Sequence, residues 1–566
     1  MKKVFTYIQP HIIRMLFGLI IKILGSLMDL GLPWVLAYIL DDVIPLKDIS
    51  LILLWGAVMI FLSIGARTFN IKANRMASKV ASDIVEVLRH DLFEKIQSLS
   101  GAQLDYFTVP SLESRMTTDT YNIHHMLGMM QRMGVRAPIL LIGGIIITST
   151  LEPVLTLVLA GVLPLLGIVV YLVSKKGIPL YTKLQLSIDR MVRVVRENIS
   201  GIRVIKALSK TQYEKGRFAK VNQEVSDMEQ RAGLTMAITN PIMNFLLNFG
   251  LTLVIIVGAY RVNSGASEPG KIVAFLSYFT IMLHAVMAIN RIFVGYSKAI
   301  ASAARIEEVL DAPEDLEEKD IPKVVTEDHI TFDHVSFAYT KEPCISDISF
   351  SLRKGESLGI IGSTGSGKTT LINLLMRFYD VKEGSIRING QDIRSIPKQE
   401  LRKKFGVVFQ NDVLFADTVV ENIRIGRDLQ NDVLWTAAEH AQAADFVKNL
   451  DGQLDYKLAI RGSNLSGGQK QRLLITRALA GMPEILILDD SSSALDYKTD
   501  ANLRKAIREN YKGTTTIMIA QRISSVMKLD HILVIEDGQM AGYGTHEELL
   551  DNCNVYQEIY QSQLMA

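Results

Sequence analysis

Six long apolar stretches occupy the first half of the 566-residue chain and constrain its fold more than any other feature. A helix needs about 20 residues to cross a hydrocarbon core ~30 Å thick. The stretches centre on residues 12–39, 51–68, 137–151, 154–173, 236–260 and 272–294. The third is short, and we expect residues 126–136 to extend it. The first half is therefore predicted to be an all-α domain with six membrane-spanning helices.

The distribution of lysine and arginine predicts the orientation of these helices. The two long connections, residues 66–136 and 175–231, are rich in basic residues, whereas the three short connections are poor in them. Basic connections stay in the cytosol, so both long connections and both termini are expected there. Segments 77–99 and 186–221 have helical periodicity and predict extensions of the spanning helices. An interruption at residues 105–111 predicts a small transverse helix that contacts another domain.

The composition changes where an acidic, proline-bearing stretch, residues 307–322, ends the helical pattern. We expect a transmembrane domain over residues 1–310, a linker over 311–328 and a separate domain over 329–566. The net charge of +2 provides no basic excess for binding nucleic acid. The two cysteines, Cys344 and Cys553, both lie in the predicted cytosolic part, where thiols stay reduced.

A glycine-rich loop follows a short apolar strand, residues 357–361, in the second half of the chain. The loop consists of Gly362, Ser363, Thr364, Gly365, Ser366, Gly367, Lys368, Thr369 and Thr370. Glycines at this spacing let backbone N–H groups approach phosphate oxygens at a helix N-terminus. In this pattern Lys368 adds positive charge at the β- and γ-phosphates, and Thr369 is a ligand for Mg²⁺. A glycine-rich turn without a ligand is the alternative.

Two further elements lie in the order that such a site requires. An apolar strand ends in Asp489 and Asp490, and the first carboxylate suits Mg²⁺ held through water. A strand followed by a solvated acidic turn is the alternative. Just upstream, a second glycine-bearing turn precedes a helix and contains Leu465, Ser466, Gly467, Gly468 and Gln469. Two anion-binding helix starts in one chain suggest a shared site.

In this order and spacing, the elements closely resemble the ATP-binding cassette (ABC) family over essentially the entire chain. The resemblance implies an α/β P-loop nucleotide-binding domain that binds ATP and Mg²⁺, with the LSGGQ signature at residues 465–469. Two cassettes of this family sandwich two ATP molecules head to tail. The resemblance makes Tyr339 the adenine-stacking aromatic, Gln410 a glutamine that senses Mg²⁺, and Asp496 part of the loop that crosses between cassettes. Thr369, Gln410 and Asp489 are then the metal-binding set.

Residues 197–207 resemble the exporter type of transmembrane domain. The implied function is ATP-driven export of an apolar or amphipathic solute, such as a drug-like molecule, a lipid or a peptide. A bacterial plasma membrane is the expected location. A regulatory subunit that holds nucleotide without consuming it and an importer with an exporter-like fold remain the alternatives.

Two catalytic positions depart from the family pattern. Asp490 stands where the family has a glutamate that polarises the attacking water, and Gln521 stands where it has a histidine. The carboxylate of Asp490 is one methylene shorter, and a glutamine cannot become cationic. With an intact phosphate loop and signature, this pattern predicts the degenerate half of a heterodimeric exporter, whose partner chain carries glutamate and histidine at these positions.

Several polar residues inside the predicted spans are candidates for lining a solute cavity. Such residues are expensive in a bilayer and often face a bundle interior. Packing between helices and contact with lipid headgroups are the alternatives. The candidates are Lys22, Asp29, Asn244, Asn248, His284, Asn290 and Arg291.

Overall fold

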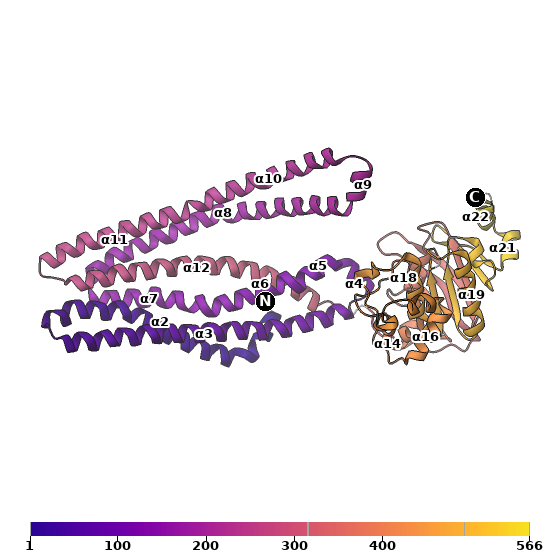
Figure 1. Cartoon of the computed structure of the whole chain (residues 1–566), viewed down its shortest axis with the longest axis horizontal. Coiled ribbons are helices and arrows are strands. Elements are labelled where there is room, and N and C mark those ends of the chain that lie inside the picture. Colours follow the sequence, from indigo (N-terminus) through magenta and orange to yellow (C-terminus); the bar gives the residue numbers. More distant parts are fainter. Residues whose placement is uncertain (1, 314–315, 492, 565–566) are drawn as a thin grey trace. The chain divides into compact units, whose positions relative to one another are not determined.

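The computed structural model describes residues 2–313, 316–491 and 493–564, so residues 314 and 315 of the predicted linker lie outside it. The chain forms two compact units (Figure 1). The first contains Met1–Ser98 and Val109–Ala312, and the second contains Leu99–Thr108 and Pro313–Ala566. A short segment from within the membrane half of the sequence therefore belongs to the second unit.

The first unit consists of helices. Their bounds are α1 Lys2–Ile8, α2 Ile12–Tyr38, α3 Ile49–Ser98, α5 Val109–Ser114, α6 Thr120–Met129, α7 Val135–Leu151, α8 Pro153–Ser200, α9 Ile202–Ala207, α10 Thr211–Ala237, α11 Thr239–Asn263 and α12 Pro269–Leu310. Among the described residues, six helical segments are long and apolar enough to cross a membrane. Each predicted span centres in one of them, which confirms the six-helix architecture.

The third span is continuous with its predicted extension through a π-helical turn, Met130–Gly134, which joins α6 to α7.

The predicted helix over residues 186–221 is wrong in part, because the chain breaks at Gly201 and again before Thr211. Ser209 has a positive φ of 54° at the second break. The result is a long hairpin in which α8 and α10 run side by side and α9 forms the tip (Figure 1).

The apolar core of the first unit collects side chains from five of the spanning helices, among them Leu30, Leu159, Phe275 and Met282. The Tyr278 hydroxyl lies in this core and donates a 2.6 Å hydrogen bond to the carbonyl of Leu30. That bond satisfies a polar group that would otherwise be buried without a partner.

Two of the polar residues proposed to line a cavity can be placed only in part. Asn248 donates to the Asn244 carbonyl on its own helix, and the side chain of Asn290 lies outside the described residues.

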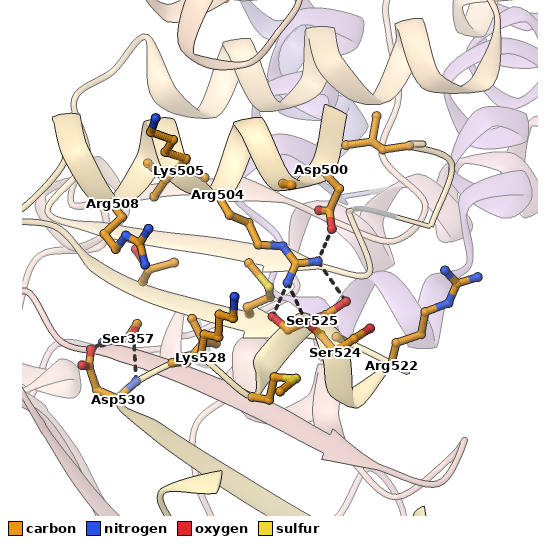
Figure 2. A pocket seen from close by; sticks show the side chains of 18 of the residues that line it. Ser357, Asp500, Arg504, Lys505, Arg508, Arg522, Ser524, Ser525, Lys528 and Asp530 are labelled. Carbon is orange, nitrogen blue, oxygen red and sulfur yellow. Dashed lines mark hydrogen bonds and ion pairs between the residues drawn. The ribbon is translucent and has the colours of Figure 1, made fainter. Parts of the chain in front are cut away.

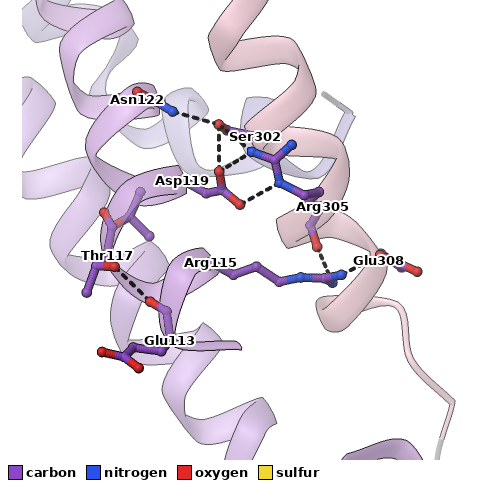
Figure 3. A network of polar contacts seen from close by, with 9 residues as sticks. Glu113, Arg115, Thr117, Asp119, Asn122, Ser302, Arg305 and Glu308 are labelled. Atoms are coloured by element: carbon purple, nitrogen blue, oxygen red, sulfur yellow. Dashed lines mark hydrogen bonds and ion pairs between the residues drawn. The ribbon is translucent and has the colours of Figure 1, made fainter. Parts of the chain in front are cut away.

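A polar network fastens the π-helical turn Arg115–Asp119 to the last turns of α12 (Figure 3). The buried carboxylate of Asp119 accepts hydrogen bonds from Ser302 Oγ at 2.8 Å and from Arg305 Nε at 2.8 Å. The Arg115 guanidinium donates to the Arg305 carbonyl at 2.7 Å and pairs with Glu308 at 2.8 Å. Because each bond joins segments far apart in sequence, the network holds this end of the helical unit together.

The second unit contains two sheets. The antiparallel sheet has the order β2-β1-β4-β5, with β1 Asp328–Phe337, β2 Ile345–Arg353, β4 Glu383–Ile388 and β5 Gln391–Asp392. The larger sheet has the order β10-β9-β3-β8-β7-β6, and only β10 runs antiparallel to its neighbour. Its strands are β3 Ser357–Gly362, β6 Phe405–Val408, β7 Ile485–Asp489, β8 Thr515–Ile519, β9 His531–Glu536 and β10 Gln539–Gly544.

Helices cover these sheets. Their bounds are α13 Lys368–Leu375, α14 Lys398–Lys403, α15 Val419–Arg424, α16 Asn431–His440, α17 Ala444–Lys448, α18 Gly467–Leu479, α19 Tyr497–Asn510, α20 Ile523–Val526, α21 His546–Asn552 and α22 Asn554–Leu564. Every residue of β7 and β8 is buried, as expected for parallel strands covered on both faces. Parallel strands with helical cover confirm the predicted α/β domain.

The segment Leu99–Thr108 packs within the second unit as helix α4, Gly101–Phe107. Ser100 caps the helix, and the Gly101 N–H donates to the Phe378 carbonyl at 3.2 Å. The Tyr379 hydroxyl donates to Asp105 Oδ2 at 2.7 Å. The transverse helix predicted at residues 105–111 thus begins four residues earlier, and it ends at Thr108, which has a φ of 60°.

We expect the Asp119→Asn variant to be less stable than the wild type. The substitution removes the charge that accepts from Arg305, and a hydrogen bond to a charged group contributes about 2 kcal/mol. Thermal unfolding of the full chain in nanodiscs measures the effect as a lower midpoint. Asp189→Asn, at an exposed position on α8, is the control and should melt like the wild type. Equal midpoints for the two variants would contradict the role given to this network.

Candidate nucleotide site

The phosphate loop connects β3 to α13 by a tight path that demands glycine. Gly362 and Gly367 have φ values of 156° and 101°. A Cβ on Gly362 would lie 2.1 Å from the backbone oxygen of Ile535, which no side chain tolerates. The loop backbone is thus held close against β9, with the positive end of α13 behind it.

The polar groups of this loop fit an oxyanion. Lys368 Nζ donates to the carbonyls of Gly362 at 3.0 Å and Ser363 at 2.6 Å. Burial lowers the pKa of Lys368, and the nearby Asp489 and Asp490 oppose that shift. The hydroxyl of Ser366 is buried and has no hydrogen-bond partner among the described residues. A phosphate group at this loop would be met by the positive charge of Lys368 and by the N-terminal end of α13.

Thr369 and Asp489, which are 120 residues apart, meet beside the loop. The Thr369 hydroxyl donates to Asp489 Oδ2 at 3.0 Å. Burial raises the pKa of Asp489, and the adjacent Asp490 raises it further. A hydroxyl and a carboxylate next to a phosphate site are the hard oxygen ligands that Mg²⁺ prefers. The donor set therefore suits this ion, whose charge would favour the ionised form of Asp489.

Asp490 follows β7 in a left-handed conformation, with a φ of 49°. Gln521 Nε2 donates to Asp490 Oδ2 at 3.0 Å, and Gln471 Nε2 donates to the Asp490 carbonyl at 3.2 Å. Burial raises the pKa of this carboxyl, whereas hydrogen bonding by Gln410 lowers it. Asp490, Gln521 and Gln410 therefore meet at one point, and amide groups hold the carboxylate.

Tyr339 lies just beyond the end of β1, and 46% of it is exposed. The ring packs edge-on against Phe337 and Tyr379, and its hydroxyl lies 3.4 Å from Thr370 Oγ1 on α13. Because nearly half of this aromatic residue is exposed next to the phosphate loop, it keeps surface available for a flat ligand.

The signature turn begins α18. Ser466 caps the helix: its hydroxyl accepts from the Gln469 N–H at 3.3 Å, and the Gln469 side chain accepts from the Ser466 N–H at 2.9 Å. Leu465 is buried, whereas Ser466 and Gly467 are exposed. A Cβ on Gly468 would lie 3.0 Å from the Ala494 carbonyl, so the turn packs closely against residues 493–496. The turn presents an accessible, electropositive helix end.

The order of the strands separates the signature turn from the phosphate loop of the same chain. The loop follows β3, whereas α18 packs against β6 at the edge of the sheet. β8 and β7 lie between β3 and β6, so these two strands are three spacings, ~14 Å, apart. The phosphate loop and α18 are therefore built on different strands of the sheet.

A cavity of about 700 Å³ lies beside Asp490 and Gln521, between α19 and the segment around α20 (Figure 2). Arg504 bridges it: the guanidinium pairs with Asp500 on α19 and donates to the Ser525 carbonyl at 2.6 Å. Asp496 caps α19 through a 2.9 Å hydrogen bond from the Thr499 N–H. Arg504 thus ties the helix that starts at Asp496 to the segment that follows Gln521. Arg504 belongs to none of the sequence motifs. The sequence pattern that could have indicated it is the pair of Asp500 and Arg504, four residues apart on one predicted helix.

Comparison with known proteins places the chain in a family. Residues 15–286 match the model of the ABC transporter transmembrane region, and residues 345–493 match that of the ABC transporter domain. The uncharacterized ABC transporter ATP-binding protein YfiB of Bacillus subtilis is 34% identical over 100% of this chain and 98% of its own length. The ATP-dependent lipid A-core flippase of Syntrophus aciditrophicus is 30% identical over 99% of this chain and 94% of its own.

A solved structure of a bacterial Atm1-family ABC exporter with ATP bound has a TM-score of 0.83 to this chain. The two are 25% identical, and the match covers 97% of this chain and 99% of that one. The chain belongs to the ABC transporter family. It has the exporter architecture of a multi-pass plasma-membrane protein, and its second unit is an ATP-binding domain that couples ATP hydrolysis to transport.

We expect the Arg504→Met variant to be less stable than the wild type. Without the guanidinium, the segment after Gln521 loses its tie to α19, and the loss of a hydrogen bond from a charged group costs about 2 kcal/mol. Thermal unfolding of the purified transporter measures the effect as a lower midpoint. Arg508→Met, at an exposed position one turn further along α19, is the matched control. Equal midpoints for the two variants would refute this role for Arg504.

Proposed function

We propose that this chain is the degenerate half of a heterodimeric ABC exporter. In this proposal residues 1–310 form the transmembrane domain, 311–328 the linker and 329–566 the ATP-binding domain. The observation that carries the proposal is the 3.0 Å hydrogen bond from Gln521 to the Asp490 carboxylate. At the two positions that should activate water and contact the γ-phosphate, a short carboxylate and an amide bind each other.

The chemistry of these two side chains explains the low activity that we assign to this site. A general base must reach the proton that it removes, and a retraction of about 1 Å can cost ~10²-fold in rate. The Asp490 carboxylate is one methylene shorter than glutamate and is engaged by Gln521. The Gln521 amide donates hydrogen bonds but cannot carry the positive charge available to histidine. Weak hydrolysis at this site follows from both features.

The remaining residues of the site are assigned to holding nucleotide. The phosphate loop, Gly362–Thr370, receives the phosphates, with Lys368 as the cation and Tyr339 as the stacking surface for adenine. Thr369, Asp489 and Gln410 are the proposed ligands of Mg²⁺, directly or through water. When bound, Mg²⁺ would neutralise phosphate charge. ATP is therefore retained on this chain longer than it is retained at an intact site.

A second chain is needed to complete both sites. We infer from the different places of the phosphate loop and the signature turn in the fold that each loop faces a signature supplied by another chain. Ser466, Gly467, Gly468 and Gln469 are proposed to complete the partner's site, with Asp496 at the crossing between cassettes. The hairpin tip also leaves the apolar residues Ile202, Val204 and Leu208 exposed, as expected of a surface covered in an assembly.

We expect Asp490→Glu alone to raise the ATPase rate of the purified pair only slightly. The longer carboxylate restores the reach to water, but Gln521 still lacks the positive charge that the γ-phosphate requires. The steady-state ATPase rate measures the change, and the Asp490→Glu, Gln521→His double variant is the comparison that should gain more. A large increase from the single variant would contradict the assignment.

We expect Ser466→Arg to reduce turnover of the pair nearly to zero. The bulky cation would block the helix end that is proposed to complete the partner's competent site, while this chain's own phosphate loop is left unchanged. Arg461→Ser, at an exposed position outside the signature, is a control for nearby surface changes and should leave turnover close to wild type. Wild-type turnover in the Ser466→Arg pair would refute the shared site.

A further inference from the structure

A polar cluster lies on three of the long helices of the first unit, towards the inner ends of their spanning segments. Lys22 and Asp29 are on α2, Asn70 and Asn74 are on α3, and Arg136 is on α7. Arg136 donates to Asp29 Oδ2 at 2.9 Å, and Asn70 donates to the same oxygen at 3.1 Å. The buried Lys22 donates to Asn74 Oδ1 at 2.9 Å. Three helices thus bring charged and amide groups to one place.

The charges of this cluster do not balance. Arg136 and Arg132 are close enough to Lys22 to repel it, and Asp29 is close enough to attract it. Asp29 is paired with Arg136. Lys22 binds an amide, and Arg132 donates to the Gly128 carbonyl of its own helix at 3.0 Å. Among the described contacts, two cations therefore have no carboxylate partner.

The cluster lies towards the inner ends of the spanning segments. The helical path of the first span continues from α2 to Leu46, so Asp29 lies ~25 Å from its outer end, and Asn70 lies ~32 Å along α3 from Ile49. Arg136 lies ~22 Å along α7 from Leu151, in a core ~30 Å thick. Contact with the inner headgroups is therefore the alternative for the exposed parts of this cluster. Arg136 is nevertheless engaged by Asp29 of a neighbouring helix.

The cluster also leaves binding groups unused. The side chain of Arg136 is 43% exposed, although its Nε is buried without a hydrogen-bond partner among the described residues. Asn70 Oδ1 is also buried and unpartnered there. An exposed guanidinium is unfavourable against lipid tails, so we expect this face to contact water, headgroups or a solute. Met130 and Met133, on the same π-helical turn as Arg132, add exposed flexible apolar surface.

We propose that this cluster binds the anionic head of an amphipathic solute, with Arg136 and Arg132 as its contacting cations and the buried Lys22 adding positive charge beside them. This inference rests on the proposed export function and specifies the solute class: a phosphate, sulfate or carboxylate group attached to an apolar body. The planar guanidinium groups suit the paired oxygens of such heads. The methionines of the π-helical turn contact the apolar part next to the head.

The test is equilibrium binding of radiolabelled dodecyl phosphate to the full-length transporter, copurified with its partner chain in nanodiscs without ATP. Empty nanodiscs give the partitioning background. We expect saturable binding that unlabelled dodecyl phosphate and dodecyl sulfate displace and that dodecyltrimethylammonium does not. Equal displacement by the cationic amphiphile would overturn the proposal, because the excess positive charge would then play no part.

Substitutions locate the binding. Arg136→Gln and Arg132→Gln should each weaken binding about tenfold, the loss expected from one charged contact. Two variants are used so that a folding defect in one, detected by size-exclusion chromatography, leaves the other. Lys72→Gln removes an exposed charge from the face of α3 opposite Asn70 and Asn74, and it should bind like the wild type. Wild-type binding by both arginine variants would overturn the site, including the case in which a partner carboxylate neutralises these cations.

Binding without ATP separates this inference from the function on which it rests. The same transporter is then assayed for ATPase stimulation by dodecyl phosphate. Charge-selective binding that Arg136→Gln weakens supports the site, whether or not dodecyl phosphate changes the ATPase rate. An unchanged ATPase rate would then contradict only the coupled export of this class of solute. Stimulation without selective binding overturns the site and leaves the export function intact.

Discussion

The order of the strands in the larger sheet is the constraint on which the functional account depends. Because β8 and β7 lie between β3 and β6, the strand that the phosphate loop follows and the edge strand against which α18 packs lie ~14 Å apart. Both elements are formed: the loop has its glycine conformations and the signature has its capping box. In the proposed pair, the second chain supplies the other half of each site.

Local sequence patterns predicted the elements that carry this geometry. Apolar length located the six spans, and the glycine spacing with a preceding strand located the phosphate loop. What could not be predicted depends on contacts between distant residues. The pairing of Asp29 with Arg136 and the packing of α4 through Tyr379 and Asp105 join segments more than 100 residues apart. No proline marks the break in the helix before Thr211, so the helical periodicity of the sequence predicted a continuous helix there.

Polar contacts also join distant segments within each of the two units. The network around Asp119 fastens α12 to the turn that follows α5, and Arg504 fastens α19 to the segment after Gln521. Each places a buried or half-buried guanidinium between two backbone segments and thereby limits their relative movement. Arg115 and Arg504 could not be predicted as structural contacts, because neither belongs to a sequence motif that binds a ligand. Their roles depend on partners that are distant in the sequence.

The most direct measurement of the central claim is the ATPase rate of this chain purified alone in nanodiscs, compared with the rate of the complex copurified with its partner. If Asp490 and Gln521 leave this site poorly competent, the chain alone should hydrolyse ATP at least about 10²-fold more slowly than the pair. A rate for the chain alone that equals the rate of the pair would show a self-sufficient pump and would contradict the account.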